Sequence, residues 1–379
     1  MTDPRPAVHV CIATGQNAAN FIPLQQYGAQ EVWILQTPAM QDSARHLATA
    51  LKDDVRHIER IDFDDSDPGA IEASAHQVAE RLDGREVVLH ATGGTKLMVL
   101  ALRDGLRLVE TGSGKLDILY ADTGRQRIDW LGSQPRSEPM TDVLDIVRML
   151  LVQGYRIDND TRHAAAQHRA AARAALTREM GDKAAQYGSA FSVLATLASQ
   201  ACDAKGEGVL TQPLHHVPSK PLAELLDKAQ TQGMLHRDGG RSLTFADASA
   251  AAYFAGGWLE EFVLLKLTGL ARPGRFGSNI QLFSADERVS NEIDAMLVHR
   301  NRALFIECKT GRQTKPQDAL YKLAQLRQRL GGSVAGALYL SAQPVGEEAL
   351  KRAREYGVQV LAAEEVGRLV PWMRDWMAR

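Results

Sequence analysis

Strand-like and helix-like runs alternate from the start of the chain, and this alternation restricts the fold more than any other feature. The strand-like runs, rich in β-branched residues, span 7–13, 31–37, 55–63 and 86–92. Runs with helical periodicity span 42–51, 70–82 and 97–108. Because a helix between two such strands makes a right-handed crossover, the pattern predicts a mostly parallel sheet covered on both faces. We expect an α/β, Rossmann-like domain over residues 1–145, closed by a hairpin at 115–131.

The rest of the chain predicts a second α/β domain and a helical segment before it. A chain of 379 residues is too long for one core, because single cores stop growing at roughly 250–300 residues. Residues 250–379 read as helix, strand, turn, strand, helix, strand, helix, strand. Residues 146–249 are mostly helical and end in a helix, helix and β-wing order. This middle segment is winged-helix-like, and it serves either packing and dimerisation or contact with nucleic acid.

Composition excludes several classes of protein. The formal net charge of -2 gives no global attraction to nucleic acid or acidic membranes, so a polyanion needs a local patch. The three cysteines, Cys11, Cys202 and Cys308, lie far apart and match neither a disulfide framework nor a zinc site. No run of about 18 apolar residues and no basic leader followed by an apolar stretch occurs. We therefore expect a cytoplasmic protein without a membrane anchor.

The stretch 291–311, NEIDAMLVHRNRALFIECKTG, sets charged residues among apolar ones. Side chains alternate along a strand, so Glu307 and Lys309 point to one face and Cys308 to the other. If the two halves pair across the turn HRNR, Asp294 lies beside Glu307 on that face. Two neighbouring carboxylates favour a hard divalent cation, Mg²⁺ or Mn²⁺, and such a site suits phosphodiester hydrolysis. The alternative is a structural ion pair between strands.

These residues, preceded by the helix GGWLEEFV, resemble the PD-(D/E)xK restriction-endonuclease-like nucleases. The resemblance implies a catalytic and metal-binding site made of Asp294, Glu307 and the helical acid Glu260, with Lys309 catalytic. Glu261 is the second candidate for the helical acid. The proline that often precedes the aspartate is replaced by Ile293. The stretch 272–315 holds eight Lys and Arg against five Asp and Glu, which suits a nucleic acid substrate, DNA or RNA.

Two polar loops follow strands of the N-terminal domain. The first offers Thr14, Gln16, Asn17 and Asn20, and the second, ATGGTK, offers Thr92, Gly93, Gly94, Thr95 and Lys96 before a helix. Both loops lie at the carboxyl ends of parallel strands, where open α/β sheets bind ligands, and a helix N-terminus suits phosphate. Neither a Walker loop nor a dinucleotide fingerprint is present. The alternative is that the glycines serve only a tight turn.

HATGGTKLM after a buried strand, together with the Gln- and Asn-rich first loop, resembles the CARF (CRISPR-associated Rossmann fold) sensor domain. The whole order resembles the CRISPR ancillary nucleases that cyclic oligoadenylate activates. This resemblance implies a type III CRISPR antiviral nuclease, cyclic tetra-adenylate as activator, and a homodimer that binds this two-fold-symmetric ring across its axis. We expect allosteric activation, in which closure of the dimer re-spaces two nuclease sites.

Two other functions remain open at this stage. A nucleotide-sensing transcription regulator would use the winged-helix-like segment as its DNA reader and a degenerate nuclease domain as scaffold. An endonuclease of DNA repair would sense some other nucleotide. The sequence does not rank DNA against RNA as substrate, and it does not tell whether the sensor domain degrades its activator.

Overall fold

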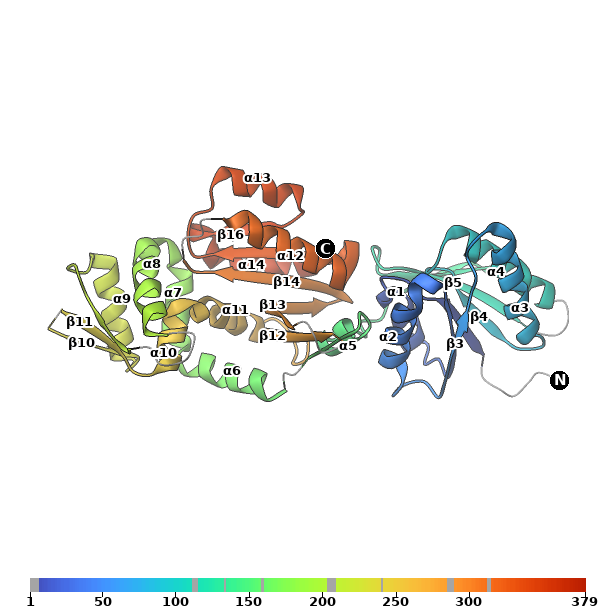
Figure 1. Cartoon of the computed structure of the whole chain (residues 1–379), viewed down its shortest axis with the longest axis horizontal. Coiled ribbons are helices and arrows are strands. Elements are labelled where there is room, and N and C mark those ends of the chain that lie inside the picture. The colour runs from blue at the N-terminus through green and yellow to red at the C-terminus, as the bar shows by residue number, and fades with distance from the viewer. Residues whose placement is uncertain are drawn as a thin grey trace.

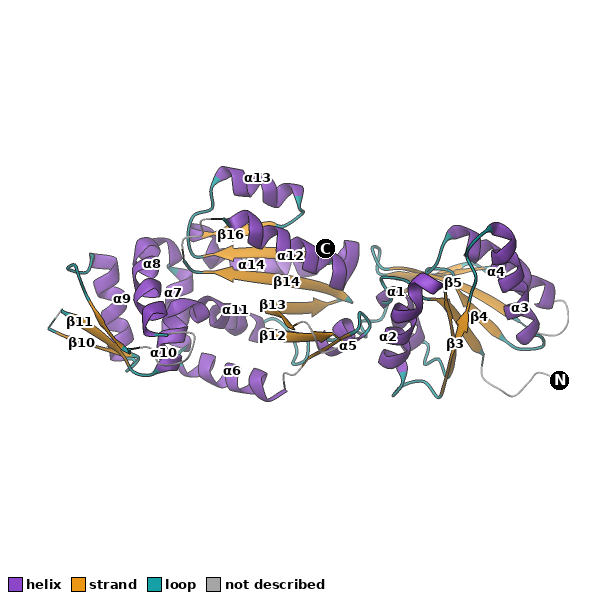
Figure 2. Cartoon of the chain, viewed as in Figure 1, coloured by secondary structure: helices purple, strands orange, loops and turns teal. Residues whose placement is uncertain are grey.

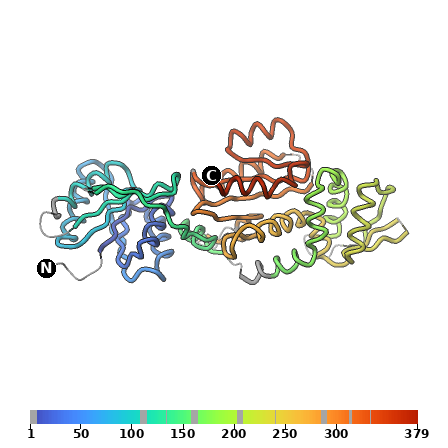
Figure 3. The backbone as a smooth tube through the Cα atoms, turned by 180° about the vertical axis from the view of Figure 1, so that it is seen from behind, coloured from blue at the N-terminus to red at the C-terminus, as the bar shows by residue number. Residues whose placement is uncertain are grey.

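The computed structural model describes residues 7–110, 115–132, 134–157, 160–202, 209–239, 241–284, 290–311 and 315–379. Within them the strands form a seven-stranded, a three-stranded and a six-stranded sheet. The chain is elongated, with the seven-stranded sheet at one end, the three-stranded sheet at the other and the six-stranded sheet between them (Figures 1, 2 and 3). No helix in the described ranges has the length and apolar character needed to cross a bilayer.

The seven-stranded sheet belongs to the N-terminal unit. Its strands lie side by side in the order β3 (His57–Asp62), β2 (Glu31–Gln36), β1 (Val8–Ile12), β4 (Val87–His90), β5 (Leu116–Asp122), β6 (Arg127–Leu131) and β7 (Arg136–Pro139). The first five run parallel, and β5, β6 and β7 form an antiparallel meander. The predicted mostly parallel sheet with its terminal hairpin is confirmed, and β7 is an addition to it.

Helices cover both faces of this sheet, as the alternation predicts. The helices α1 (Ala18–Gln26) and α2 (Gln41–Leu51) pack on the face that carries Cys11, while α3 (Pro68–Arg81) and α4 (Lys96–Glu110) pack on the face that carries Val10. The sequence analysis treated residues up to Asn20 as a loop, but α1 already begins at Ala18. The helix forms there because Phe21, Ile22 and Leu24 are buried against the sheet, which outweighs the polar start of the segment.

The middle segment is helical, with a small sheet at its end. Its elements are α5 (Ile146–Leu151), β8 (Tyr155–Ile157), α6 (Asp160–Ala172), α7 (Ala174–Asp182), α8 (Ala184–Ala201), β9 (Thr211–Pro213), α9 (Lys220–Thr231), β10 (Leu235–Asp238), β11 (Ser242–Phe245) and α10 (Ala248–Ala252). The predicted helix, helix and wing correspond to α8, α9 and the β10–β11 hairpin, to which β9 adds a third strand. The segment is mostly helical as expected, but its strand β8 pairs with β12 of the C-terminal sheet.

The C-terminal unit is built on the six-stranded sheet. It contains the helical turn η2 (Tyr253–Gly257), α11 (Trp258–Thr268), β12 (Phe276–Ser284), β13 (Ser290–His299), β14 (Arg302–Lys309), α12 (Pro316–Gly331), η3 (Gly332–Val334), β15 (Gly336–Ser341), α13 (Glu347–Glu355), β16 (Gln359–Ala362), η4 (Ala363–Arg368) and α14 (Leu369–Ala378). The strand order is β16-β15-β14-β13-β12-β8. The predicted β13–β14 hairpin is present, and β12 and α14 are elements that the sequence analysis did not separate.

The N-terminal and C-terminal units share one continuous apolar core through α5. Ile146, Met149 and Leu150 of this short helix are buried in a cluster that contains residues of both sheets. The turn of the β13–β14 hairpin is tied to the same connection, because Asn301 Oδ1 accepts hydrogen bonds from the backbone N–H groups of Val143 (2.9 Å) and Leu144 (3.0 Å). The hairpin is therefore anchored to the segment that leaves the N-terminal unit.

Candidate functional site

The β13–β14 hairpin gathers the three residues that the sequence pattern singled out. The antiparallel register pairs Ala295 with Ile306, so Asp294 and Glu307 come next to each other one step further along. Lys309 Nζ lies 2.5 Å from Glu307 Oε1 and 3.7 Å from Asp294 Oδ2. Asp294 Oδ2 also accepts a hydrogen bond of 2.7 Å from the backbone N–H of Cys308, which holds this carboxylate against β14. We call Asp294, Glu307, Lys309 and the nearby Glu260 the carboxylate–lysine cluster.

The helix α11 supplies an acid to this cluster, and its two adjacent glutamates face different surroundings. Glu260 lines one groove together with Lys309, and the Asn279 side chain acts to lower the pKa of its carboxyl group. Glu261 instead lies 3.4 Å from Arg173, the residue before α7, with one carboxylate oxygen buried and without a hydrogen-bond partner. Only Glu260 of the pair is therefore turned toward Asp294 and Lys309.

The electrostatics of the cluster favour a bound cation. Burial, followed by the negative charges of Asp294 and Glu292, raises the pKa of Glu260 to about 8. Burial and the charge of Asp294 likewise raise the pKa of Glu307. Burial by itself would lower the pKa of Lys309, but Glu307 and Asp294 outweigh it and raise that pKa to about 12. The Glu260 carboxyl therefore keeps its proton near neutral pH, and a divalent cation would relieve the crowding of negative charge that favours this proton.

The donor set of the cluster fits Mg²⁺ or Mn²⁺. The groups that converge are carboxylate oxygens, the ligands that hard cations prefer, whereas the Cys308 thiol lies on the other face of β14 with its pKa raised by burial. Within the ranges that the structure describes, no three acidic, imidazole or thiol groups are already drawn together as a metal site. The Lys309 ammonium now bridges Glu307 and Asp294, so a cation would share these carboxylates with it.

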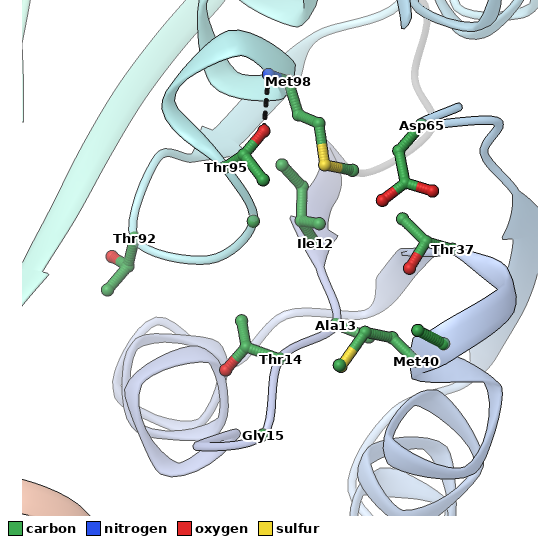
Figure 4. A pocket seen from close by; sticks show the side chains of 12 residues that line it. Ile12, Ala13, Thr14, Gly15, Thr37, Met40, Asp65, Thr92, Thr95 and Met98 are labelled. Carbon is green, nitrogen blue, oxygen red and sulfur yellow. Dashed lines mark hydrogen bonds between the residues drawn. The ribbon is translucent and has the colours of Figure 1, made fainter. Parts of the chain in front are cut away.

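A second candidate site lies at the carboxyl ends of the parallel strands of the N-terminal unit. A cavity of about 430 Å³ opens there, between the loop after β1 and the loop that leads into α4. Figure 4 shows the side chains of Met98, Asp65, Thr37 and Met40 around one side of this cavity and those of Thr14 and Thr92 around the other. The N-terminus of α4 meets the cavity at Gly94 and Thr95, and the start of a helix suits an anionic ligand.

Four of the nine residues predicted for this ligand line the cavity: Thr14, Thr92, Gly94 and Thr95. Asn17 and Asn20 are buried inside the loop and α1 instead. The Asn17 amide donates to Ser43 Oγ at 2.8 Å, and the Asn20 amide donates to the carbonyl of Ile12 at 2.8 Å. Gly93 and Lys96 flank the lining residues without being part of the wall. These asparagines thus shape the loop, and Lys96 is exposed at the first turn of α4.

Gln16 points away from the cavity toward the C-terminal unit. Its amide donates a hydrogen bond of 3.1 Å to the carbonyl of Gln328 in α12. A side chain on Gly332, which follows α12, would begin 2.6 Å from Gln16 Oε1, so the two are closely packed. The loop predicted to bind the ligand therefore touches the end of a helix whose middle turns border the carboxylate–lysine cluster.

The structure of the protein itself requires both glycines of the ATGGTK loop, whether or not a ligand binds there. A Cβ on Gly93 would lie 2.2 Å from the carbonyl oxygen of Ile12, and one on Gly94 would lie 2.7 Å from the Ile12 side chain. Gly94 also has a φ of +76°, which favours glycine. Thr92 Oγ1 accepts from the backbone of Ala121 at 2.7 Å, and Thr95 Oγ1 accepts from Met98 at 3.3 Å at the start of α4. The loop conformation is thus fixed by the protein itself.

Thr37, Met40, Asp65 and Met98 line the cavity and were missed by the sequence analysis. The first three follow β2 and β3, whose carboxyl ends meet those of β1 and β4 at one edge of the sheet. The rule that ligands bind beyond the carboxyl ends of strands could have found them, because the β2 and β3 runs were recognised. Met98 is at helical spacing in α4, where the pattern reads only as core.

The Lys and Arg side chains of the stretch 272–315 are less available to bind nucleic acid than their number suggests. Arg275 pairs with Asp142 at 2.7 Å, and Arg302 stacks on Trp376 and donates to its carbonyl at 3.2 Å. Residues 286–288 and 312 lie outside the described residues. The cations beside the cluster that the structure does show come from α12, namely Lys322 and Arg329.

Comparison with known proteins gives two matching family models. Residues 8–147 match the model described as the CARF domain of Card1, and residues 247–379 match the model described as the Card1-like endonuclease domain. No curated protein gives a significant match. Together the two models leave the middle segment between residues 147 and 247 unmatched.

Several solved structures share the fold. Protein VC1899 from Vibrio cholerae is 22% identical, with 98% of each chain covered and a TM-score of 0.83. Can2 from Sulfobacillus thermosulfidooxidans, solved in complex with cyclic tetra-adenylate, is 21% identical, with 98% of this chain and 96% of that chain covered and a TM-score of 0.76. A type III CRISPR defence DNA nuclease activated by cyclic oligoadenylate is 17% identical, covering 94% of this chain and 50% of that chain with a TM-score of 0.54.

Proposed function

Because this chain combines a CARF domain of the Card1 family with a Card1-like endonuclease domain, we propose that it is a type III CRISPR defence nuclease switched on by cyclic tetra-adenylate. Two structural neighbours support the activator, since one is solved with cyclic tetra-adenylate and another is described as activated by cyclic oligoadenylate. The substrate we propose is nucleic acid, DNA or RNA. The domain limits we propose are 1–145 for the sensor, 146–249 for the middle segment and 250–379 for the nuclease.

The observation that carries the proposal is the carboxylate–lysine cluster. The Lys309 ammonium lies 2.5 Å from Glu307 and 3.7 Å from Asp294, and Glu260 of α11 lines the groove beside Lys309. A simple structural ion pair between strands would need one acid, whereas this cluster crowds three carboxyl groups into a partly buried place at an electrostatic cost. Groups that are held together against such repulsion favour a catalytic role.

We assign the parts of the reaction as follows. Asp294, Glu307 and Glu260 would hold Mg²⁺ or Mn²⁺, which when bound polarises a phosphoryl oxygen and makes water a better nucleophile. Lys309 carries a full positive charge at neutral pH, because its pKa is about 12, and it stabilises the negative charge that builds on the phosphoryl group. The N–H of Cys308 fixes one oxygen of Asp294, which keeps the carboxylate oriented while the substrate binds.

The N-terminal cavity is where we expect the activator. It presents the start of α4 and the hydroxyl-bearing Thr14 and Thr95 to an anionic ligand, and Asp65 can accept a hydrogen bond from an adenine amino group. Leu97 and Leu100, next along α4, are 55% and 50% exposed. An exposed apolar pair beside a ligand site fits burial against a second copy of the chain, so we propose a homodimer with the ring across its two-fold axis.

Two contacts connect the proposed ligand loop and sensor domain to the nuclease. Gln16 reaches α12 through Gln328, and Asn301 ties the turn of the β13–β14 hairpin to residues 143 and 144. A ligand that moves the loop after β1 would thus displace a helix that borders the cluster. Such coupling requires that the ligand bind one of the two arrangements more tightly.

One assay tests the proposal. Purified protein is incubated with labelled single-stranded RNA, single-stranded DNA and supercoiled plasmid, with and without cyclic tetra-adenylate and Mn²⁺. We expect cleavage only when both are present, and none by Glu307→Ala, which should still bind the activator. A protein that binds a specific duplex and never cuts would instead support the transcription regulator. Cutting that ignores cyclic tetra-adenylate but depends on another nucleotide would support the repair endonuclease.

A further inference from the structure

Two grooves border the carboxylate–lysine cluster and divide its four residues between their walls. The first, of about 670 Å³, is lined by one face of α8 together with Glu260 and Lys309, and we call it the α8 groove. The second, of about 510 Å³, is lined by α12 together with Asp294 and Glu307, and we call it the α12 groove. Because the four cluster residues are divided between the two walls, a chain that passes from one groove into the other must cross the cluster.

The side of the α8 groove that α8 forms is polar and uncharged. Ser192, Thr196, Ser199 and Gln200 of α8 face it at helical spacing, and Lys309 is its only cation among the described lining residues. The opposite face of α8 is buried in the core of the middle segment, so packing does not explain the polar face. Hydroxyl and amide groups of this kind can donate and accept hydrogen bonds with sugars and base edges.

The α8 wall is held in place relative to the catalytic strand. The helix is kinked at Gly188, and the side chain of Gln343 donates to the carbonyl of Gly188 at 2.8 Å and to that of Thr310 at 3.3 Å. Thr310 directly follows Lys309. Gln343 is itself buried, so this bridge fixes the distance between α8 and the end of β14.

The side of the α12 groove that α12 forms is cationic and aromatic, whereas Glu292, Asp294 and Glu307 line the side formed by β13 and β14. Lys322 and Arg329 face it from α12, and the charge of Lys322 acts on Glu307. Arg329 is held 5.2 Å from the ring of Tyr155. Tyr321 is 52% exposed at the same wall, although it also meets Tyr356 edge to face. Cations and an exposed ring are the groups that bind phosphates and stacked bases.

We propose that one strand of the nucleic acid substrate runs through both grooves and so crosses the cluster between them. Lys322 and Arg329 hold backbone phosphates on the α12 side, and the α8 hydroxyl and amide groups hold sugars and base edges on the other. This inference rests on the proposed nuclease function, and it gives the middle segment a direct part in substrate binding. The two sides differ in charge, so they differ in how salt affects them.

Fluorescence anisotropy with a labelled oligothymidylate tests both sides in EDTA, where no cleavage occurs, with cyclic tetra-adenylate present. Affinity is measured with the full chain from about 50 to 200 mM salt. We expect Lys322→Ala to weaken binding and to lower the slope of log affinity against log salt by about 0.7, the value for one phosphate contact on a single strand. Lys322→Arg should restore the slope. Lys351→Ala, which removes an exposed cation from α13, is the matched control and should leave it unchanged.

The α8 side is tested by filling its groove. Ser199→Trp should weaken binding about tenfold or more without changing the salt slope, because it blocks a neutral surface. Val193→Trp places the same bulk on α8 outside the groove, where Val193 is 45% exposed, and should bind as the wild type does. Gln200→Ala, a smaller change that does not threaten folding, should weaken binding by a lesser factor in the same manner.

Each outcome decides the inference. Wild-type affinity in Ser199→Trp and Gln200→Ala would remove the α8 groove from the strand path, and an unchanged slope in Lys322→Ala would remove the α12 groove. Cleavage by the wild type with Mn²⁺ is measured in parallel. If the wild type cuts while these variants bind normally, the strand path is wrong and the nuclease function stands. If the wild type neither binds nor cuts, both are overturned.

Discussion

Replacing Lys309 with methionine should destabilise the metal-free protein and make it respond more strongly to a divalent cation. The ammonium lies 2.5 Å from Glu307 and 3.7 Å from Asp294, and these charges raise its pKa from 10.5 to about 12. This rise in the pKa corresponds to roughly 2 kcal/mol of stabilisation at neutral pH. The stabilisation is present below the ordinary pKa and is lost only as pH rises through the raised one. This stabilisation is smaller than the ~3–5 kcal/mol lost when a fully buried ion pair is broken. The difference is expected because the Lys309 and Glu307 side chains are each about a quarter exposed to solvent.

Thermal melting without metal measures this loss. We expect the transition of the nuclease domain to fall by about 5–10 °C in Lys309→Met. Lys351→Met, which removes an exposed cation of α13, is the control and should leave the transition in place. Mn²⁺ should raise the transition of Lys309→Met more than that of the wild type, because the ammonium no longer repels the ion. Cleavage should stay lost even when the ion restores stability.

Two results would refute this reasoning. An unchanged transition in metal-free Lys309→Met would mean that the ammonium does not offset the repulsion between Asp294 and Glu307. An equal response of both proteins to Mn²⁺ would mean that the ion binds away from Lys309, and the assignment of these carboxylates as ligands would then be wrong.

Four further predictions follow from named contacts. Glu260→Gln should abolish cleavage. Glu261→Gln disturbs only the pair with Arg173, so its cleavage rate should stay within a few fold of the wild-type rate. Comparable losses in the two variants would contradict the orientation of α11. Gly94→Ala should remove the thermal stabilisation by cyclic tetra-adenylate, because a Cβ at a φ of +76° would lie 2.7 Å from Ile12; a normal ligand-induced shift would speak against this cavity as the site. Gln16→Ala should keep the affinity for cyclic tetra-adenylate, measured by calorimetry, but weaken the activation of cleavage several fold. A loss of affinity instead would mean that Gln16 contacts the activator directly. Burial lowers the pKa of His9 from 6.5 to about 4, so only the unfolded chain takes up this proton as pH falls between these values. His9→Gln should therefore spare the sensor domain roughly 3 kcal/mol of the loss of stability on acidification, measured by urea unfolding at several pH values. If the stability of variant and wild type fell in parallel with pH, this reasoning would be wrong.

Much of the candidate nuclease site could be predicted because its spacing is local. Glu307 and Lys309 are two residues apart on one strand, so they share a face whatever surrounds them. The turn between β13 and β14 is short, and pairing across it fixes Asp294 opposite Glu307. The choice between Glu260 and Glu261 was not available from the sequence, because neighbouring positions on a helix differ by about 100° and only the packing of α11 against α7 and β12 sets which one faces the strands.

The sensor cavity shows the opposite case. The sequence placed the two polar loops at the carboxyl ends of the parallel strands, where the cavity lies. It could not tell that Asn17 and Asn20 turn inward to hold the loop while Gln16 turns outward to α12. All three are polar amides within five residues, so local chemistry does not separate them. Asp65 and Met40 come from the ends of other strands, and their share in the cavity depends on how far each loop extends over the sheet.

By itself the sequence determined the alternation that makes a parallel sheet, the hairpin register and the residue types that gather on its face. Side-chain directions repeat every 2.0 residues in a strand and every 3.6 residues in a helix, and both repeats can be read from the sequence of one chain. Tertiary structure alone decided that α8 of the middle segment forms a wall of the groove that Glu260 and Lys309 line, and that the loop after β1 touches α12. Such contacts join residues more than a hundred positions apart, and they depend on how whole elements pack, which no local pattern records.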